Sequence, residues 1–181
     1  MALLKQVALA VCVLAILCGG VVLRLHAQSR PSTQLSETQV KAAFLFNFMK
    51  FVEWPLPDAQ TRPYAICIAG PDDVRHALAA LLTAAGESGR GFAVRALPEG
   101  DDPRECHSVF IAAGEARRTS AIIGQVARAA VLTVGETPSF LREGGIVRLY
   151  VNDNRLRFQI DPVGARSARL KVSAQLLSLG Q

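Results

Sequence analysis

The sequence predicts an α/β fold, in which a mostly parallel sheet of about six strands forms the middle of three layers, with helices on both faces. Between residues 64 and 134, short apolar runs rich in β-branched side chains alternate with helical segments, and this alternation is typical of parallel sheets. The last two apolar runs, at 146–151 and 155–160, are separated only by Asn152-Asp153-Asn154. This spacer suits a tight turn, so we expect the sheet to end in an antiparallel hairpin.

The N-terminal segment has the pattern of a secretory signal. Lys5 supplies a positive charge, residues 7–23 carry none, and Leu25-His26-Ala27 forms a cleavage site before a polar stretch. We therefore expect a signal peptide at 1–27, a flexible leader at 28–35 and the α/β domain at 36–181. A retained membrane anchor is the alternative, although the apolar run is just under the length that spans a bilayer and Gly19-Gly20 interrupts it.

Cleavage changes both the length and the charge of the chain. The remaining 154 residues suit one domain with a single core. Two positive charges leave with the signal peptide, so the formal net charge falls from +5 to +3. A weakly basic exported domain excludes nucleic acid as the expected partner.

The first element of the predicted domain is a helix at residues 36–54. Ser36 and Gln39 form a capping-box pattern, and Pro55 and Pro57 stop the helix. Its first apolar face follows a helical spacing and consists of Val40, Phe44, Phe48 and Phe51.

The same helix has a second apolar face, made by Ala42, Phe46 and Met49. A helix that is apolar around so much of its circumference is buried on two sides, or is buried on one side and meets a partner on the other. The candidate partner-binding or dimer face comprises Ala42, Phe46, Met49, Lys50 and Trp54. The alternative is a core helix that the chain itself covers on both sides.

The remaining elements follow in alternation. Strands are expected at 64–69, 92–97, 107–112 and 131–134, with helices at 72–86 and 115–129 and a turn-rich connector at 86–91. After the hairpin, Asp161-Pro162 opens a closing helix. Its apolar set is Val163, Leu170, Val172, Leu176 and Leu177.

Two cysteines remain in the expected mature chain, Cys67 in a predicted strand and Cys106 leading into the next one. Outside the cytoplasm such a pair is a candidate disulfide. Closing a loop of this length stabilises a protein by about 4 kcal/mol in the chain-entropy model. Two buried free thiols are the alternative.

The sequence shows no set of catalytic or cofactor-binding residues. It lacks the dinucleotide-binding glycine motif, the G-x-S-x-G elbow and the H-E-x-x-H metal motif. His76 is expected to be solvated and His107 to be structural rather than a metal ligand. Arg155 and Arg157 share one strand face, most simply a solvated one, with contact to a partner or an anion as the alternative. We therefore expect no enzyme activity, no cofactor and no metal.

Several strings of the chain resemble the YfiR family. They are KAAFLFNFMKFVEWP, YAICIAG, VLTVGETPSFLREGGIVRLYV, NRLRFQID and ARLKVSAQLLSL, and the resemblance covers residues 38–179. It implies that Cys67 and Cys106 form the structural disulfide of that family. A second cysteine pair, found in some members, is missing between residues 141 and 148, so a redox switch that depends on it is not expected here.

The resemblance also implies a function. Members of that family are dimeric periplasmic repressors of an inner-membrane diguanylate cyclase, YfiN, and an outer-membrane lipoprotein, YfiB, can sequester them. Release of the cyclase raises cyclic di-GMP and favours biofilm. We therefore expect a non-enzymatic periplasmic homodimer of this kind. The alternative is a small-molecule-binding sensor or adaptor for another membrane signalling protein, with a pocket near Gly70-Pro71 and Gly135-Glu136 at the carboxyl ends of the strands.

Overall fold

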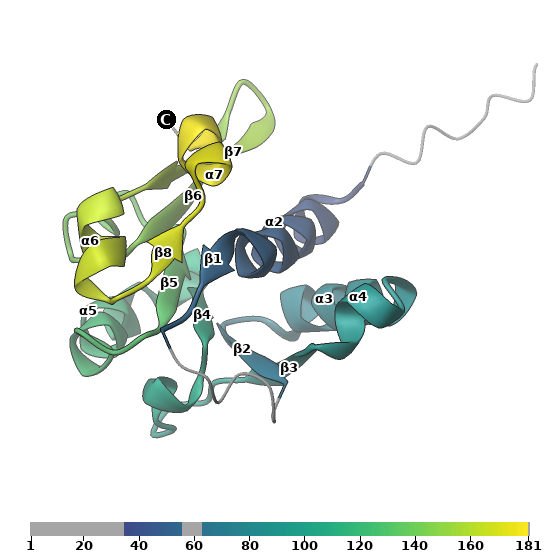
Figure 1. The fold of residues 1–181 in the computed structure, drawn as a ribbon, viewed down its shortest axis with the longest axis horizontal. Coiled ribbons are helices and arrows are strands. Elements are labelled where there is room, and N and C mark those ends of the chain that lie inside the picture. The colour runs from purple at the N-terminus through teal and green to yellow at the C-terminus, as the bar shows by residue number, and fades with distance from the viewer. Residues whose placement is uncertain (1–34, 56–62, 181) are drawn as a thin grey trace, which may run out of the picture. The chain divides into compact units, whose positions relative to one another are not determined.

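The computed structural model describes residues 35–55 and 63–180 (Figure 1). The predicted signal peptide, and the leader apart from Leu35, lie outside the described residues. The described helices and strands follow one another as α2 (Glu37–Phe51), β1 (Val52–Glu53), β2 (Tyr64–Ala69), α3 (Asp72–Ala84), α4 (Glu87–Arg90), β3 (Phe92–Ala96), β4 (Ser108–Ile111), α5 (Ala116–Gln125), β5 (Leu132–Gly135), β6 (Val147–Asn152), β7 (Arg155–Ile160), α6 (Pro162–Ser167), β8 (Lys171–Val172) and α7 (Ala174–Leu179). Short 3-10 turns at Pro103–Glu105 and Ala113–Glu115 flank β4.

The main sheet confirms the predicted fold class. Its six strands have the order β3-β2-β4-β5-β6-β7. The first five run parallel, and β7 is antiparallel to β6. Asp153 and Asn154 have φ values of 48° and 56°. Two consecutive left-handed residues give the turn that matches the natural twist of a hairpin, and Asp and Asn tolerate that conformation better than most residues.

The sheet separates two layers of helices because side chains alternate along each strand. Ile66 and Ile68 of β2 point into a core with α2 and α3, whereas Cys67 and Ala69 point into the core under α5. Figure 1 shows α2 and α3 on the opposite side of the sheet from α5. Because side chains alternate along YAICIA, β2 contributes residues to both cores.

The helix predicted at residues 36–54 is wrong at its C-terminal end. The capping box of Ser36 and Gln39 is present, but α2 ends at Phe51, and Val52–Glu53 continues as an extended strand. This strand pairs antiparallel with β8, placing Val52 opposite Val172. The pairing satisfies backbone groups that an extra helical turn would have satisfied locally.

The predicted closing helix is likewise divided into α6, β8 and α7. The Asp161 side chain caps α6 by accepting from the Val163 backbone N–H. Arg169 then adopts a left-handed φ of 60°, which ends the helical path, and Ser173 begins α7 as a new cap. The pairing of β8 with β1 joins segments more than 100 residues apart, so local sequence could not reveal it.

Candidate functional site

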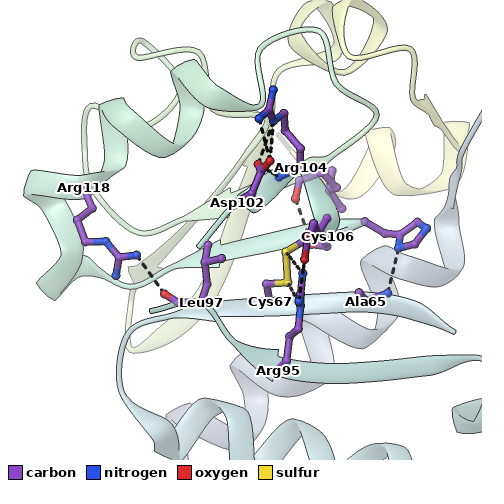
Figure 2. The surroundings of a disulfide bond; sticks show 12 residues. Ala65, Cys67, Arg95, Leu97, Asp102, Arg104, Cys106 and Arg118 are labelled. Carbon is purple, nitrogen blue, oxygen red and sulfur yellow. Dashed lines mark hydrogen bonds and ion pairs between the residues drawn. A yellow bond between two sulfur atoms is a disulfide. The ribbon is translucent and has the colours of Figure 1, made fainter. Parts of the chain in front are cut away.

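The predicted disulfide between Cys67 and Cys106 is present (Figure 2). The sulfur atoms are 2.02 Å apart and the Cα atoms 6.0 Å apart, which is ordinary disulfide geometry. Both residues are buried in the core under α5. The bond ties the centre of β2 to the segment that enters β4, and it leaves neither sulfur as a free thiol nucleophile.

An arginine of the edge strand β3 lies against this disulfide. Figure 2 shows Arg95 reaching across the sulfur atoms, with its Nε 3.1 Å from the Cys67 Sγ. The same guanidinium pairs with Glu105 at 3.2 Å. Arg95 therefore links the bridge to the loop before β4.

The loop between β3 and β4 is held at its other end by α5. Arg118 donates to the backbone oxygens of Leu97 and Pro98 at 3.1 and 3.0 Å and pairs with Glu115 at 3.0 Å. Within the loop, Asp102 accepts from the Arg104 side chain (Figure 2). These contacts hold the loop between β3 and β4 in place around the disulfide.

The predicted partner face of α2 is largely covered by this chain itself. Ala42, Phe46 and Met49 have relative exposures of 1%, 7% and 4%. They belong to the core that also contains the apolar side chains of α3, and Phe92 of β3 packs edge-on against Phe46 at 5.5 Å between ring centroids. Of the two alternatives left open for this face, these three residues fit the helix that the chain itself covers. The spacing of a helix does not say which of its faces other parts of the chain will reach.

The two other residues of that predicted face lie nearer the surface. Lys50 is exposed and places its Nζ 5.2 Å from the centroid of the Phe46 ring. Trp54 is half-buried, and its Nε1 donates to the backbone oxygen of His107 at 3.2 Å.

His107 has the structural role that was expected. Its Nδ1 accepts the backbone N–H of Ala65 at 3.0 Å, and its ring meets Tyr64 edge-on at 4.8 Å. Burial lowers the pKa of His107 below its usual value, so the neutral form that this acceptor role requires is favoured. In the described part of the chain, no three His, Cys, Asp or Glu side chains gather as a possible metal site.

The carboxyl ends of the parallel strands, where a ligand pocket was predicted, are tied together by the chain's own contacts. Glu136 follows β5, pairs with Lys41 of α2 at 2.6 Å, and accepts the Ala113 N–H at 2.9 Å. A Cβ on Gly70 would lie 2.5 Å from the Ala112 Cβ, and one on Gly135 would overlap the Phe140 ring. The two glycines of the predicted pocket therefore serve close packing.

A groove of about 490 Å³ lies elsewhere, between α5 and α6. Its lining includes apolar side chains such as Ile123 and Val126, and two carboxylates, Glu143 and Asp161. Ser139 and Ser120 donate to the Glu143 carboxylate, and these two hydrogen bonds lower its pKa. No motif in the sequence pointed to this groove, because residues from 120 to 168 contribute to it and only the fold brings them together.

A comparison with solved structures bears on the fold. The crystal structure of a conserved domain protein from Vibrio cholerae O1 biovar El Tor strain N16961 is similar, with a TM-score of 0.53 and 10% sequence identity. The match covers 81% of this chain and spans 60% of that one, so it supports the fold alone. Among curated proteins no match was found. None of the helices in the described ranges is long and apolar enough to cross a membrane.

The third comparison identifies the family. The family model described as YfiR/HmsC-like matches residues 38–181, a range that begins in the first turn of α2 and contains every described strand. It also contains both partners of the Cys67–Cys106 bond. The chain belongs to the YfiR/HmsC-like family.

Proposed function

We propose that this protein is a non-enzymatic regulator of the periplasm that binds the periplasmic region of an inner-membrane diguanylate cyclase and represses it. The family match over residues 38–181 carries the proposal, because membership of the YfiR/HmsC-like family suggests a periplasmic regulatory protein. The Cys67–Cys106 disulfide supports the compartment, since such bonds persist in oxidising surroundings and are rare in the cytosol.

The proposal includes partners and an assembly state. The cyclase is YfiN-like, a YfiB-like outer-membrane lipoprotein sequesters the repressor, and the repressor acts as a homodimer. Lys50 of α2 and Trp54, which follows β1, are candidates for the contact surface, because Lys50 is exposed and Trp54 is half-buried. Export by a cleavable signal peptide places the domain on the same side of the membrane as these partners.

Deletion of the gene tests the proposed repression. Cyclic di-GMP should rise in the deletion strain and return to its original level when the wild-type gene is restored. A second deletion, removing the membrane-bound cyclase encoded nearby, should abolish the rise. An unchanged cyclic di-GMP level in the single deletion strain would refute repression.

Direct binding is measured with the purified periplasmic region of that cyclase. We expect a complex by calorimetry, and a dimer by sedimentation of the repressor alone. Lys50→Glu should weaken the complex, whereas Arg117→Glu, at an exposed position of α5 on the other side of the sheet, serves as the matched control. Equal binding by the two variants would remove Lys50 from the proposed surface.

A sensor of small molecules is the second candidate, and the groove between α5 and α6 favours it. Its volume of about 490 Å³ lies in the range of sites for small ligands. A thermal-shift screen of the purified protein against periplasmic metabolites tests this function. Hits that disappear in a variant with Gly124→Leu at the groove would support it, and the absence of any hit would count against it.

A further inference from the structure

The hairpin of β6 and β7 has one face that is half-buried at Arg148, Tyr150 and Gln159 and exposed toward the turn. Leu149 and Phe158 point into the core that contains α2. The alternate residues point the other way, and no side chain of either strand belongs to the core under α5. This second face consists of three cross-strand pairs: Arg148 with Gln159, Tyr150 with Arg157, and Asn152 with Arg155.

This basic hairpin face, formed by Arg148, Tyr150, Arg155 and Arg157, concentrates positive charge. Arg155 and Arg157 are both exposed and, being two residues apart on one strand, have Cα atoms about 7 Å apart. Arg148 lies over the Tyr150 ring, with 5.1 Å between the guanidinium carbon and the ring centroid. Like charges at this spacing repel one another unless an anion lies between them.

The described carboxylates do not neutralise this face. None of the ion pairs in residues 35–55 and 63–180 includes Arg155 or Arg157. The acidic side chain of the turn, Asp153, instead accepts from the Asn152 amide at 3.3 Å. The charge is therefore available to an anionic partner outside the described chain.

The hairpin tip also exposes an apolar side chain, Val151, which lies on the opposite face of the strand from Arg157 because it pairs with Leu156. Every residue from Val151 to Arg155 is exposed, and Val151 itself has a relative exposure of 55%. In Figure 1 the turn between β6 and β7 reaches the periphery of the fold beside α7. Because the two side chains lie on opposite faces, only a surface that meets the tip end-on can touch Arg155 and Val151 together.

We propose that the basic hairpin face docks this protein onto an anionic phospholipid surface. Guanidinium groups bind phosphate oxygens in a bidentate way, tyrosine favours the boundary between headgroups and acyl chains, and an exposed valine fits the same boundary. A specific protein complex takes about 20–30 residues from each side, more than this hairpin tip offers. A lipid surface needs no such area and draws its attraction from the charge.

Vesicle flotation of the chain purified from the periplasm tests the proposal. We expect binding to vesicles of phosphatidylglycerol and phosphatidylcholine, weaker binding to phosphatidylcholine alone, and a loss of binding as salt is raised. The double variant R155Q/R157Q should lower partitioning to the anionic vesicles about thirtyfold, since each arginine near such a surface contributes about fivefold. R155K/R157K keeps the charge and should retain most of the binding.

A matched control removes the same charge elsewhere. R117Q/R166Q changes two exposed arginines of α5 and α6 and should leave vesicle binding unchanged. Equal loss in both double variants would attribute the binding to net charge and overturn the proposal, as would equal binding of R155Q/R157Q and the wild type. Inorganic phosphate at matched ionic strength should not displace the protein more than chloride does, and stronger displacement would indicate a site for free phosphate instead.

The same variants separate a lipid from a protein partner. If R155Q/R157Q floated with anionic vesicles like the wild type but failed to bind the periplasmic region of the cyclase, the face would be a protein interface and the lipid assignment would be wrong. The vesicle experiment contains no cyclase, so its failure leaves the proposed repression intact.

Discussion

Lys41 of α2 donates to Glu136 at the carboxyl end of β5, with 2.6 Å between the Lys41 Nζ and the Glu136 Oε1. The other Glu136 oxygen accepts the Ala113 N–H, 2.9 Å away, after β4. One carboxylate thus joins a helix to two neighbouring strand ends. Burial acts to lower the pKa of Lys41, but its hydrogen bonds with Glu136 and Glu37 outweigh burial, and the net pKa is raised.

Glu136→Gln should therefore destabilise the fold. The side chains of Lys41 and Glu136 are only 17% and 14% exposed, and a lost hydrogen bond between charged groups costs about 1–3 kcal/mol. Urea unfolding measures the change. Glu37→Gln is the matched control, because Glu37 is 60% exposed in a pair with the same lysine and such surface pairs contribute about 0.5 kcal/mol or less. Equal losses in the two variants would contradict the role given to Glu136.

Removing the disulfide should lower the free energy of unfolding more than Glu136→Gln does. C67A/C106A opens a loop with a sequence separation of 39 residues, and we expect the free energy of unfolding to fall by about 4 kcal/mol in the chain-entropy model. The comparison is made by urea unfolding of protein from the periplasm. Mass spectrometry under non-reducing conditions should first show Cys67 joined to Cys106 in the wild type. A loss below about 1 kcal/mol would mean that the bond does little to restrict the unfolded chain.

Alanine at Gly135 and alanine at Gly124 should change the free energy of unfolding in opposite directions. A Cβ on Gly135 would overlap the ring of the buried Phe140, so Gly135→Ala should lower the free energy of unfolding by about 1–3 kcal/mol. A Cβ on Gly124 of α5 meets nothing within 4 Å. There alanine favours the helix, and we expect a gain of up to about 1 kcal/mol. Thermal melting of the two variants measures both signs, and a stabilised Gly135→Ala would contradict the close packing.

Stability should fall in mild acid because of His107. Its pKa is lowered in the folded state by burial, so the unfolded chain takes up a proton first. The contribution is fully present above the ordinary pKa of 6.5 and is lost as pH falls below that value toward the folded pKa. Urea unfolding between neutral pH and pH about 5 measures the slope.

Two variants isolate that slope. His107→Asn keeps an acceptor near the Ala65 N–H, does not titrate, and should flatten the dependence of stability on pH in this range. His76→Gln removes an exposed histidine and should keep the wild-type slope. Identical slopes for the wild type and His107→Asn would assign the acid sensitivity to other groups.

Local patterns were sufficient for much of the fold. The alternation in YAICIA determines which side chains of β2 enter each core, and the Asn152–Asn154 spacer determines the hairpin. The capping box of Ser36 and Gln39 sets the start of α2. These features depend on residues within a few positions of one another, and backbone sterics and side-chain period act at that range.

The sequence by itself also determined that the cysteine pair of the predicted exported domain could form a bridge, and the resemblance of its strings indicated the family. Only the tertiary structure decided that Val172 pairs with Val52 and so divides the closing helix. It alone decided that α3 and Phe92 cover Phe46 and its neighbours. The physical reason is the same in both cases. An extended segment pairs with, and an apolar helix face is covered by, whichever distant part of the chain reaches it, and local residue spacing does not indicate which part that is.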